Sequence, residues 1–303
     1  MIDASMDPGS KAATPDQAGK AAVFQALHAR PGAFVIPNPW DAGTARILAA
    51  LGFEALATTS AGLAFALGQR DGMAGRDETL ANASAIVART ALPVSADLEN
   101  GFGDAPEHAA ETIRLAAAAG LVGGSIEDAS GDPAQPIYGF EHAAERIAAA
   151  AEAARALPFP FMLTARAENF LHGQPDLDDT IRRLQAFERA GADVLYAPGL
   201  PDLAAVRAVC AAVSRPVNVL AGNVLAGGSV AALAEAGVKR ISLGGLLSRA
   251  ALGGLVRAAR EIKESGTFGF AADALPFAEA NGFMRDRHSP DRHSIVLRAK
   301  ASM

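Results

Sequence analysis

The sequence predicts an α/β protein: a single closed (β/α)8 barrel of the TIM type, with an N-terminal extension and a C-terminal helical tail. The first observation is an alternation, because short apolar runs and Ala-rich helical segments follow one another eight times. Strands that alternate with helices pair in parallel through right-handed crossovers. Eight such units in a chain of 303 residues fit a closed barrel better than a doubly wound open sheet.

The second observation is the recurrence of glycine where helical segments end, at Gly52, Gly120, Gly191 and Gly237. Glycine adopts the left-handed backbone conformation in which a helix can stop. Each of these glycines precedes a predicted strand by a few residues. They therefore mark the same turn in one repeating unit.

Each repeat contributes one strand and one helix. The strands are short apolar runs bounded by turn-forming residues, and they are predicted at 34–37, 55–59, 94–98, 124–128, 161–166, 194–197, 217–220 and 240–243. The helices are predicted at 41–51, 77–91, 105–119, 141–156, 178–190, 202–213, 229–236 and 246–264. Asp41 and Ser229 stand at the start of their helices and are expected to be N-caps.

The two ends of the chain differ from this repeat. Residues 1–19 are rich in Ala, Asp, Pro, Ser and Gly and lack the pattern of a secretory signal, so a disordered tail is expected there. The barrel is predicted to cover 20–265. The segment 266–303 breaks the repeat, yet Phe268 and Phe277 are among several apolar residues in it. Such a tail should pack on the barrel or on a neighbouring subunit.

Bulk composition excludes several classes of protein. The net charge of −6 gives no basic footprint, so no nucleic-acid partner is expected. No run of 18 apolar residues is present, so no membrane span is expected. The single cysteine, Cys210, excludes an internal disulfide and a cysteine-rich zinc site, and it fits the reducing cytoplasm as the expected location.

Polar residues gather at the carboxyl ends of the predicted strands, whereas the strand starts hold no comparable set. In barrels of this kind, chemistry takes place at the carboxyl ends. The one-sided distribution therefore indicates a catalytic mouth. Its members are Ser60 after the second strand, Asp97 and Glu99 after the third, Glu127 after the fourth, Arg166 after the fifth and Asn218 on the seventh.

The stretch 94–103 carries the clearest chemical signal. Asp97 and Glu99 are two residues apart, so on a strand they would point the same way. Two carboxylates on one face resist ionising together, and a divalent cation between them removes the conflict. Ligands that are all oxygen suit Mg²⁺. The alternative is a solvated strand end that carries two acids.

Six stretches in order along the chain resemble the isocitrate lyase/phosphoenolpyruvate mutase superfamily over residues 20–265. They are 59–62 (TSAG), 69–72 (QRDG), 95–103 (SADLENGFG), 124–128 (GSIED), 164–168 (TARAE) and 191–196 (GADVLY). The resemblance implies a Mg²⁺-dependent barrel enzyme, with Mn²⁺ as a substitute, that acts on a small 2-oxo-carboxylate. A C–C or P–C bond breaks in such enzymes and leaves an enolate-type species.

The resemblance also implies a role for each matching residue. Asp97 would bind the metal directly, and Asp71, Glu99 and Glu127 would hold its waters. The catalytic set implied is Arg166, Ser60 and Asp71. The substrate-binding set implied is Ser60, Ala61, Gly62, Arg166 and Asn218.

One departure keeps the reaction open. The lyases of this superfamily carry Lys-x-Cys-Gly-His in the loop after the fourth strand, whereas residues 129–139 here contain no Lys, Cys or His. We expect C–C cleavage of a 2-oxo-carboxylate, such as an oxaloacetate-like decarboxylation. The alternatives are a phosphonate P–C mutase or hydrolase and a non-catalytic carboxylate-binding protein. Tyr138 is a candidate acid in this loop, and Cys210 is expected to pack in a helix without a catalytic role.

The long segments after the second strand (60–76) and the fourth strand (129–140) are expected to be loops that could close over the mouth. A homotetramer is expected because the tail is apolar and because relatives exchange a helix between subunits. The last barrel helix or the tail would then pack on a partner.

Overall fold

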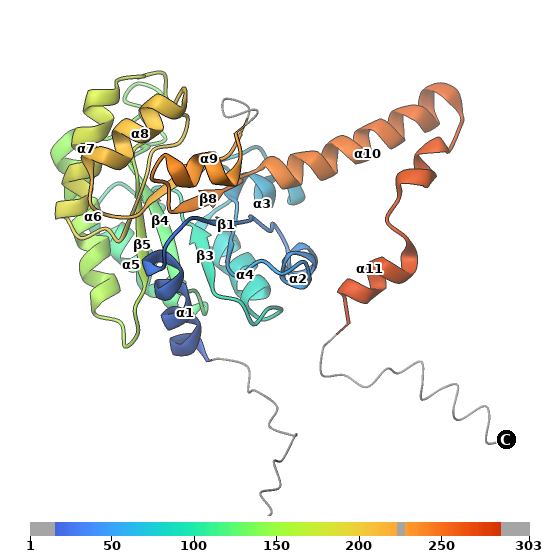
Figure 1. Ribbon diagram of the computed structural model, residues 1–303, viewed down its shortest axis with the longest axis horizontal. Helices are drawn as coiled ribbons and strands as arrows, with labels where there is room; N and C mark the ends of the chain where they lie inside the picture. The colour runs from blue at the N-terminus through green and yellow to red at the C-terminus, as the bar shows by residue number, and fades with distance from the viewer. Residues whose placement is uncertain (1–15, 223–227, 286–303) are drawn as a thin grey trace, which may run out of the picture.

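The computed structural model describes residues 16–222 and 228–285, and its eight parallel strands form a barrel surrounded by helices (Figure 1). The strands are β1 (Phe34–Ile36), β2 (Leu56–Ala57), β3 (Val94–Asp97), β4 (Gly123–Glu127), β5 (Met162–Arg166), β6 (Val194–Tyr196), β7 (Val217–Leu220) and β8 (Arg240–Ser242). β1 pairs with β8, and the order continues through β7 to β2. A backbone hydrogen bond of 3.1 Å from Ala57 to Pro37 links the two ends of the sheet. The predicted (β/α)8 barrel is confirmed.

The helices lie close to their predicted positions. The α-helices are α1 (Gln17–Ala29), α2 (Ala42–Ala50), α3 (Ser60–Ala66), α4 (Arg76–Val87), α5 (Pro106–Ala118), α6 (Phe140–Arg155), α7 (Leu177–Arg189), α8 (Leu203–Ala212), α9 (Val230–Glu235), α10 (Leu246–Ser265) and α11 (Phe277–Phe283). The carboxylate of Asp41 and the hydroxyl of Ser229 accept hydrogen bonds from the first turns of α2 and α9, as N-caps do. The four helix-ending glycines all have positive φ, between 90° at Gly52 and 105° at Gly191, which is the conformation that their position predicts.

Two helices stand where the sequence analysis places none. α1 begins at Gln17, inside the expected tail, because Asp16 caps it by accepting a hydrogen bond from Gly19. The remainder of that tail, residues 1–15, lies outside the described residues. α3 occupies the start of the expected loop 60–76, and its N-cap Thr59 accepts from the Gly62 N–H.

The apolar core lies outside the barrel wall, whereas much of the barrel interior is polar. On β5, Leu163 and Ala165 are fully buried in the core. The alternate residues Thr164 and Arg166 make polar contacts inside the barrel, as the period of two along a strand requires. A barrel interior of this type is usually filled by branched apolar side chains. Its polarity here indicates a functional interior.

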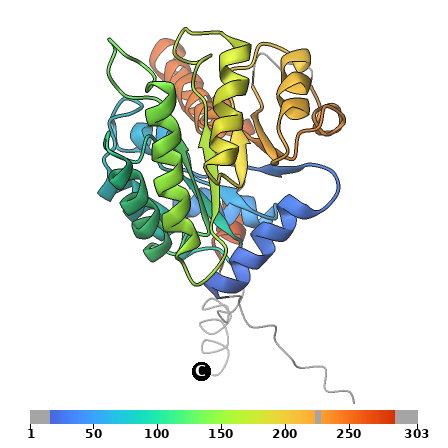
Figure 2. The ribbon, with the colours of Figure 1, turned by 90° about the vertical axis from the view of Figure 1, so that its left-hand side faces the viewer.

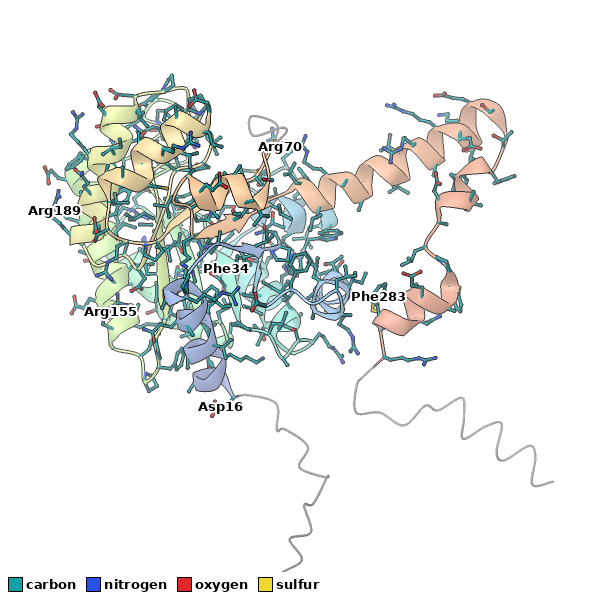
Figure 3. All side chains as sticks on the ribbon, in the orientation of Figure 1. Asp16, Phe34, Arg70, Arg155, Arg189 and Phe283 are labelled. Atoms are coloured by element: carbon teal, nitrogen blue, oxygen red, sulfur yellow. The ribbon has the colours of Figure 1, made fainter. Side chains whose placement is uncertain are left out.

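The helix α1 covers the end of the barrel where the strands begin, at the bottom of Figure 2. Phe24 packs in an apolar cluster with residues of β1, β5 and β6. His28 lies edge-on between Phe24 and Phe34, with ring centroids 4.7 and 5.1 Å apart. Asp16 at the start of α1 and Arg70, next to Asp71, therefore lie on opposite sides of the barrel (Figure 3).

The C-terminal part leaves the barrel. α10 projects outward and is followed by a 3-10 helix, η2 (Gly269–Asp273), and by α11 (Figure 1). Arg46 of α2 donates a hydrogen bond of 3.4 Å to the carbonyl of Phe283. Phe268 and Phe277 are 67% and 84% exposed, so the described part of the tail is not buried on its own barrel. Within residues 16–222 and 228–285, no helix is long and apolar enough to cross a membrane.

Cys210 lies in α8, half-buried against the apolar core, and a Cβ at Gly237 would lie 3.0 Å from the Cys210 Cβ. Burial raises the pKa of the thiol to about 11. A thiol with so high a pKa forms little thiolate at neutral pH.

We therefore expect Cys210→Ala to keep full activity and to lower the free energy of unfolding by only about 1 kcal/mol. The native protein should also react slowly with a thiol reagent at neutral pH, whereas the urea-unfolded protein should react fast. Thermal denaturation and labelling followed by mass spectrometry measure both. Inactivation by the reagent that substrate prevents would contradict this prediction.

Candidate active site

The guanidinium of Arg166 is the centre of the polar cluster at the carboxyl end of the barrel. It forms ion pairs with Asp97 at 2.9 Å, Glu127 at 3.0 Å and Glu168 at 2.8 Å. Burial alone would lower the pKa of this guanidinium, but the three carboxylates raise it well above its ordinary value. Arg166 is therefore a permanent, fixed positive charge in the mouth.

The strand register produces this cluster. Glu127 on β4 is aligned with Arg166 on β5, and β4 pairs on its other side with β3, which ends at Asp97. Glu168 follows two residues after Arg166, and its N–H donates a 2.8 Å hydrogen bond to Asp128. Asp128 in turn pairs with Arg183 of α7 at 3.0 Å. The acids around Arg166 are thus held by neighbouring strands and by a helix behind them.

The residues that open α3 also contact the cluster. The Ser60 hydroxyl donates a hydrogen bond of 2.8 Å to Asp97, whose own N–H donates to Thr58. Gly62 has no room for a side chain, since a Cβ there would lie 2.7 Å from Thr59 and 2.8 Å from Trp40. The structure therefore places Ser60 in contact with Asp97, with Ala61 and Gly62 following it in the first turn of α3.

The premise that Asp97 and Glu99 share one strand is wrong. β3 ends at Asp97, and Glu99 has φ of 49°, in the left-handed region. The Glu99 N–H instead donates a hydrogen bond of 3.4 Å to the Asp97 carboxylate. The two acids still interact, because the turn brings Glu99 to the same mouth.

These carboxylates outnumber the positive charges close to them. Burial, followed by the charges of Asp97 and Asp71, raises the pKa of Glu99 to about 7, while Arg166 lowers it. Burial and then Asp97 raise the pKa of Asp71, and burial is also the largest cause of the raised pKa of Glu127. The mouth therefore holds a proton that a cation could replace.

The described residues do not gather three Asp, Glu, His or Cys side chains into a metal cage. Mg²⁺ usually takes one or two carboxylates and keeps several waters, so it does not need such a cage. The donors present at the mouth are carboxylate oxygens with an excess of negative charge. This donor set fits Mg²⁺ in chemistry and in charge.

A cavity of about 60 Å³ extends from this cluster into the barrel. Asn218 is buried in its wall, where it accepts a hydrogen bond of 2.8 Å from Arg240 and donates one of 3.0 Å to Ser242. The polar and charged residues around the cavity are Asn38, Thr58, Thr59, Ser95, Asp97, Ser125, Arg166, Tyr196, Asn218, Arg240 and Ser242.

Of the polar residues in this wall, the sequence predicts Asp97, Arg166 and Asn218 as site residues and misses the others, of which Tyr196 and Arg240 have the largest side chains. Tyr196 on β6 is aligned with Arg166, whose guanidinium carbon lies 5.2 Å from the centre of the tyrosine ring. Arg240 starts β8 and is buried below the mouth. The signal that could have identified Tyr196 is its place at the end of a strand, because it occupies the last position of β6 as Arg166 does of β5.

Tyr138, the candidate acid of the loop, points elsewhere. Its hydroxyl donates a hydrogen bond of 2.7 Å to Asp104 and accepts one of 3.1 Å from Asn100. The segment 129–139 is closed by a β-bridge between Ala129 and Ile137. The hydrogen bonds of Tyr138 join the end of this loop to the segment before α5.

Residues 24–263 match the family model of phosphoenolpyruvate phosphomutase. The chain belongs to this family. A crystal structure of a protein provisionally described as a lyase/mutase, from Burkholderia cenocepacia J2315, is 61% identical with a TM-score of 0.86, covering 91% of this chain and 98% of that one. Within the family, the isocitrate lyase/phosphoenolpyruvate mutase resemblance is confirmed.

Two further relatives in this superfamily differ in coverage. An uncharacterized protein of Mycobacterium tuberculosis (strain ATCC 25618 / H37Rv) is 31% identical over 265 residues, which are 87% of this chain and 96% of that protein. The 2,3-dimethylmalate lyase of Eubacterium barkeri is 32% identical over 170 residues, which are 54% of this chain and 57% of the lyase. Of these relatives, those that carry a functional name are lyases or mutases.

The raised pKa of Glu99 has a consequence for stability. The folded protein keeps this proton up to a pH of about 7, whereas an unfolded glutamate releases it near 4.5. The stability that this bound proton contributes is therefore fully present below pH 4.5. It is lost as pH rises through 7, so the free energy of unfolding falls.

In metal-free protein, we expect Glu99→Gln to raise the free energy of unfolding at about pH 8 by roughly 2 kcal/mol, and to have far less effect at about pH 4.5. Urea denaturation at both pH values measures the difference. Added Mg²⁺ should stabilise the wild type more than the variant. An equal gain at both pH values would contradict a proton held by Glu99.

Proposed function

We propose that the protein is a Mg²⁺-dependent lyase that cleaves a C–C bond of a small 2-oxo-carboxylate through an enolate intermediate, as in an oxaloacetate-like decarboxylation. The observation that carries this proposal is the Arg166 guanidinium, fixed by three carboxylates at the mouth of the barrel. It stands beside a polar cavity of a size that suits a small substrate group.

The chemistry follows from where charge develops. Cleavage next to a carbonyl moves negative charge onto the carbonyl oxygen. A guanidinium that is already in place stabilises that charge without reorganisation. Arg166 is such a group, because its three ion pairs prevent the side chain from moving away.

The residues expected to hold the ion and the substrate lie around Arg166. Asp97 would bind Mg²⁺, with Asp71, Glu99 and Glu127 holding its waters, and the ion would polarise the carbonyl oxygen as a Lewis acid. The Ser60 hydroxyl and the Ala61 N–H would bind the carboxylate, beside Gly62, whose own N–H is donated to Thr59. Asn218 would bind the part that enters the cavity. Mn²⁺ could replace Mg²⁺ because both prefer oxygen ligands.

The second candidate is cleavage of a phosphonate P–C bond, which the name of the matching family favours. The named relative 2,3-dimethylmalate lyase favours C–C cleavage. The missing Lys-x-Cys-Gly-His loop leaves a third candidate, a protein that binds a carboxylate and does not turn it over.

A panel of 2-oxo-acids and phosphonates, with and without Mg²⁺, tests these candidates. We expect Mg²⁺-dependent release of pyruvate from one or more 2-oxo-carboxylates, measured with a coupled dehydrogenase, and loss of release on addition of a chelator. Release from phosphonopyruvate alone would favour the second candidate. Oxalate binding without turnover of any compound would favour the third.

Two variants serve as metal controls for this panel. Asp97→Ala should abolish Mg²⁺ binding and turnover, while Glu99→Gln should lower metal affinity by about 10–100-fold, as loss of an outer partner does. Calorimetric titration with Mg²⁺ separates binding from activity. Normal turnover by Asp97→Ala would overturn the metal assignment.

The cytoplasm remains the expected location, and a homotetramer is the proposed assembly. α10 carries apolar residues into solvent, with Leu255 65% and Leu252 40% exposed. A hollow of about 200 Å³ lies between α3 and α10, lined by Trp40, Phe65 and Leu255 among others. We infer that a second copy of the chain covers this surface.

Sedimentation at micromolar concentration should therefore give the mass of four chains. Leu255→Arg should shift the mass downward, because a charge would be buried at the interface. Val23→Arg is the matched control, since Val23 is also 46% exposed but lies on α1. A monomeric wild type would contradict the assembly.

A further inference from the structure

The cavity below Arg166 contains a chain of hydrogen bonds whose direction can be deduced. It starts at Arg240, which is buried and has no ion-pair partner among the carboxylates of residues 16–222 and 228–285. Arginine has donors only, so the Asn218 atom that faces its Nε at 2.8 Å must be the oxygen. The orientation of the Asn218 amide is therefore fixed by a permanent cation.

The next bond follows from this orientation. The Asn218 amide nitrogen donates to the Ser242 oxygen at 3.0 Å. Ser242 lies next to Tyr196, and both line the cavity. Among the hydrogen bonds of the described residues, none runs from the Tyr196 hydroxyl to a protein acceptor, so its proton is left for another acceptor.

That other acceptor has to be in the cavity. Tyr196 lines it together with Asp97 and Arg166, and its ring lies against the Arg166 guanidinium. The residue is 8% exposed, so bulk water has little access to it. The hydroxyl of Tyr196 is therefore an oriented donor next to the group expected to bind the substrate oxygens.

Resting on the proposed function, we propose that Tyr196 is the catalytic acid that protonates the enolate carbon. The electron pair of the enolate C=C bond takes the Tyr196 proton and forms the new C–H bond, while the C–O⁻ becomes the carbonyl. The O–H bond of Tyr196 breaks and leaves a phenolate. The Ser242 hydroxyl and the Arg166 guanidinium stabilise this phenolate, and it regains a proton from solvent when product leaves.

The surroundings support this role. Burial raises the pKa of Tyr196 to about 12, with Arg166 acting in the opposite direction, so the hydroxyl carries its proton at neutral pH. The chain has only two tyrosines, and the hydroxyl of the other, Tyr138, is already donated to Asp104. Tyr138 is therefore a natural control.

The test uses the reverse of the protonation step. The group that protonates the enolate carbon also removes a proton from the methyl group of pyruvate, so the enzyme with Mg²⁺ should exchange these protons in D₂O. Proton NMR measures the rate, and calorimetry with oxalate measures binding at the same site. Neither needs the natural substrate.

We expect Tyr196→Phe to lower the exchange rate by about 100-fold or more, the usual size of a general-acid contribution. Its oxalate affinity should change by less than about threefold, which separates loss of the proton from loss of binding. Tyr138→Phe should keep both exchange and oxalate affinity within about threefold of wild type.

Ser242→Ala tests the orientation of the donor. It should lower exchange by about tenfold, and the double variant Ser242→Ala/Tyr196→Phe should be no slower than Tyr196→Phe alone, because both changes act on one proton. Additive losses would overturn the directed chain. Circular dichroism confirms that each variant is folded.

Three outcomes are distinguishable. Full exchange by Tyr196→Phe would overturn the inference while the proposed function stands. A wild type that binds oxalate with Mg²⁺ but does not exchange pyruvate would overturn the inference in the same way. A wild type that neither binds oxalate nor turns over any compound would contradict the proposed function itself.

Discussion

The ion pairs of Arg166 are the interaction on which the site depends. Its side chain is 13% exposed, and a guanidinium at that depth is costly unless it is paired and hydrogen-bonded. Asp97, Glu127 and Glu168 supply the partners from β3, β4 and the turn after β5. A shift of one residue in the register would turn these side chains to the other face of the sheet and leave the cation unpaired. The charge cluster and the strand register therefore specify each other.

Charge is separated by depth inside the barrel. The acids lie at the mouth, where burial and repulsion by Asp97 and Asp71 raise the pKa of Glu99 to about 7. Below them, Arg240 is surrounded by neutral partners such as Asn218 and Thr164, the latter at 2.9 Å. The mouth thus has more carboxylates than cationic side chains, whereas Arg240 in the interior has no carboxylate partner among the described residues. Such an arrangement favours a cation at the mouth and an oriented, neutral donor below it.

The sequence predicts those features that depend on local pattern. The strands, the caps at Asp41 and Ser229 and the glycine turns follow from periodicity and backbone preference, and all are confirmed. The left-handed turn at Glu99 could not be predicted, because nothing about a glutamate favours positive φ. The contacts of Arg240 could not be predicted either, since they depend on its register with Asn218 on β7 and on Thr164 of the non-adjacent β5. The positions of strand ends in the sequence predict which residues lie close together. The hydrogen bonds between those residues can be determined only from the folded barrel.

The loop after β4 holds Tyr138 away from the mouth of the barrel. Arg183 donates to the carbonyl of Tyr138 at 2.9 Å, and the guanidinium of Arg146 lies 4.4 Å from the centre of its ring. These contacts hold the end of the loop in place, and the loop contains no Lys, Cys or His. Compared with a donor in that loop, a donor on β6 lies at a distance from Arg166 that strand pairing sets. Proton transfer from such a donor requires only that the substrate enters the cavity, whereas a loop acid also requires the loop to close.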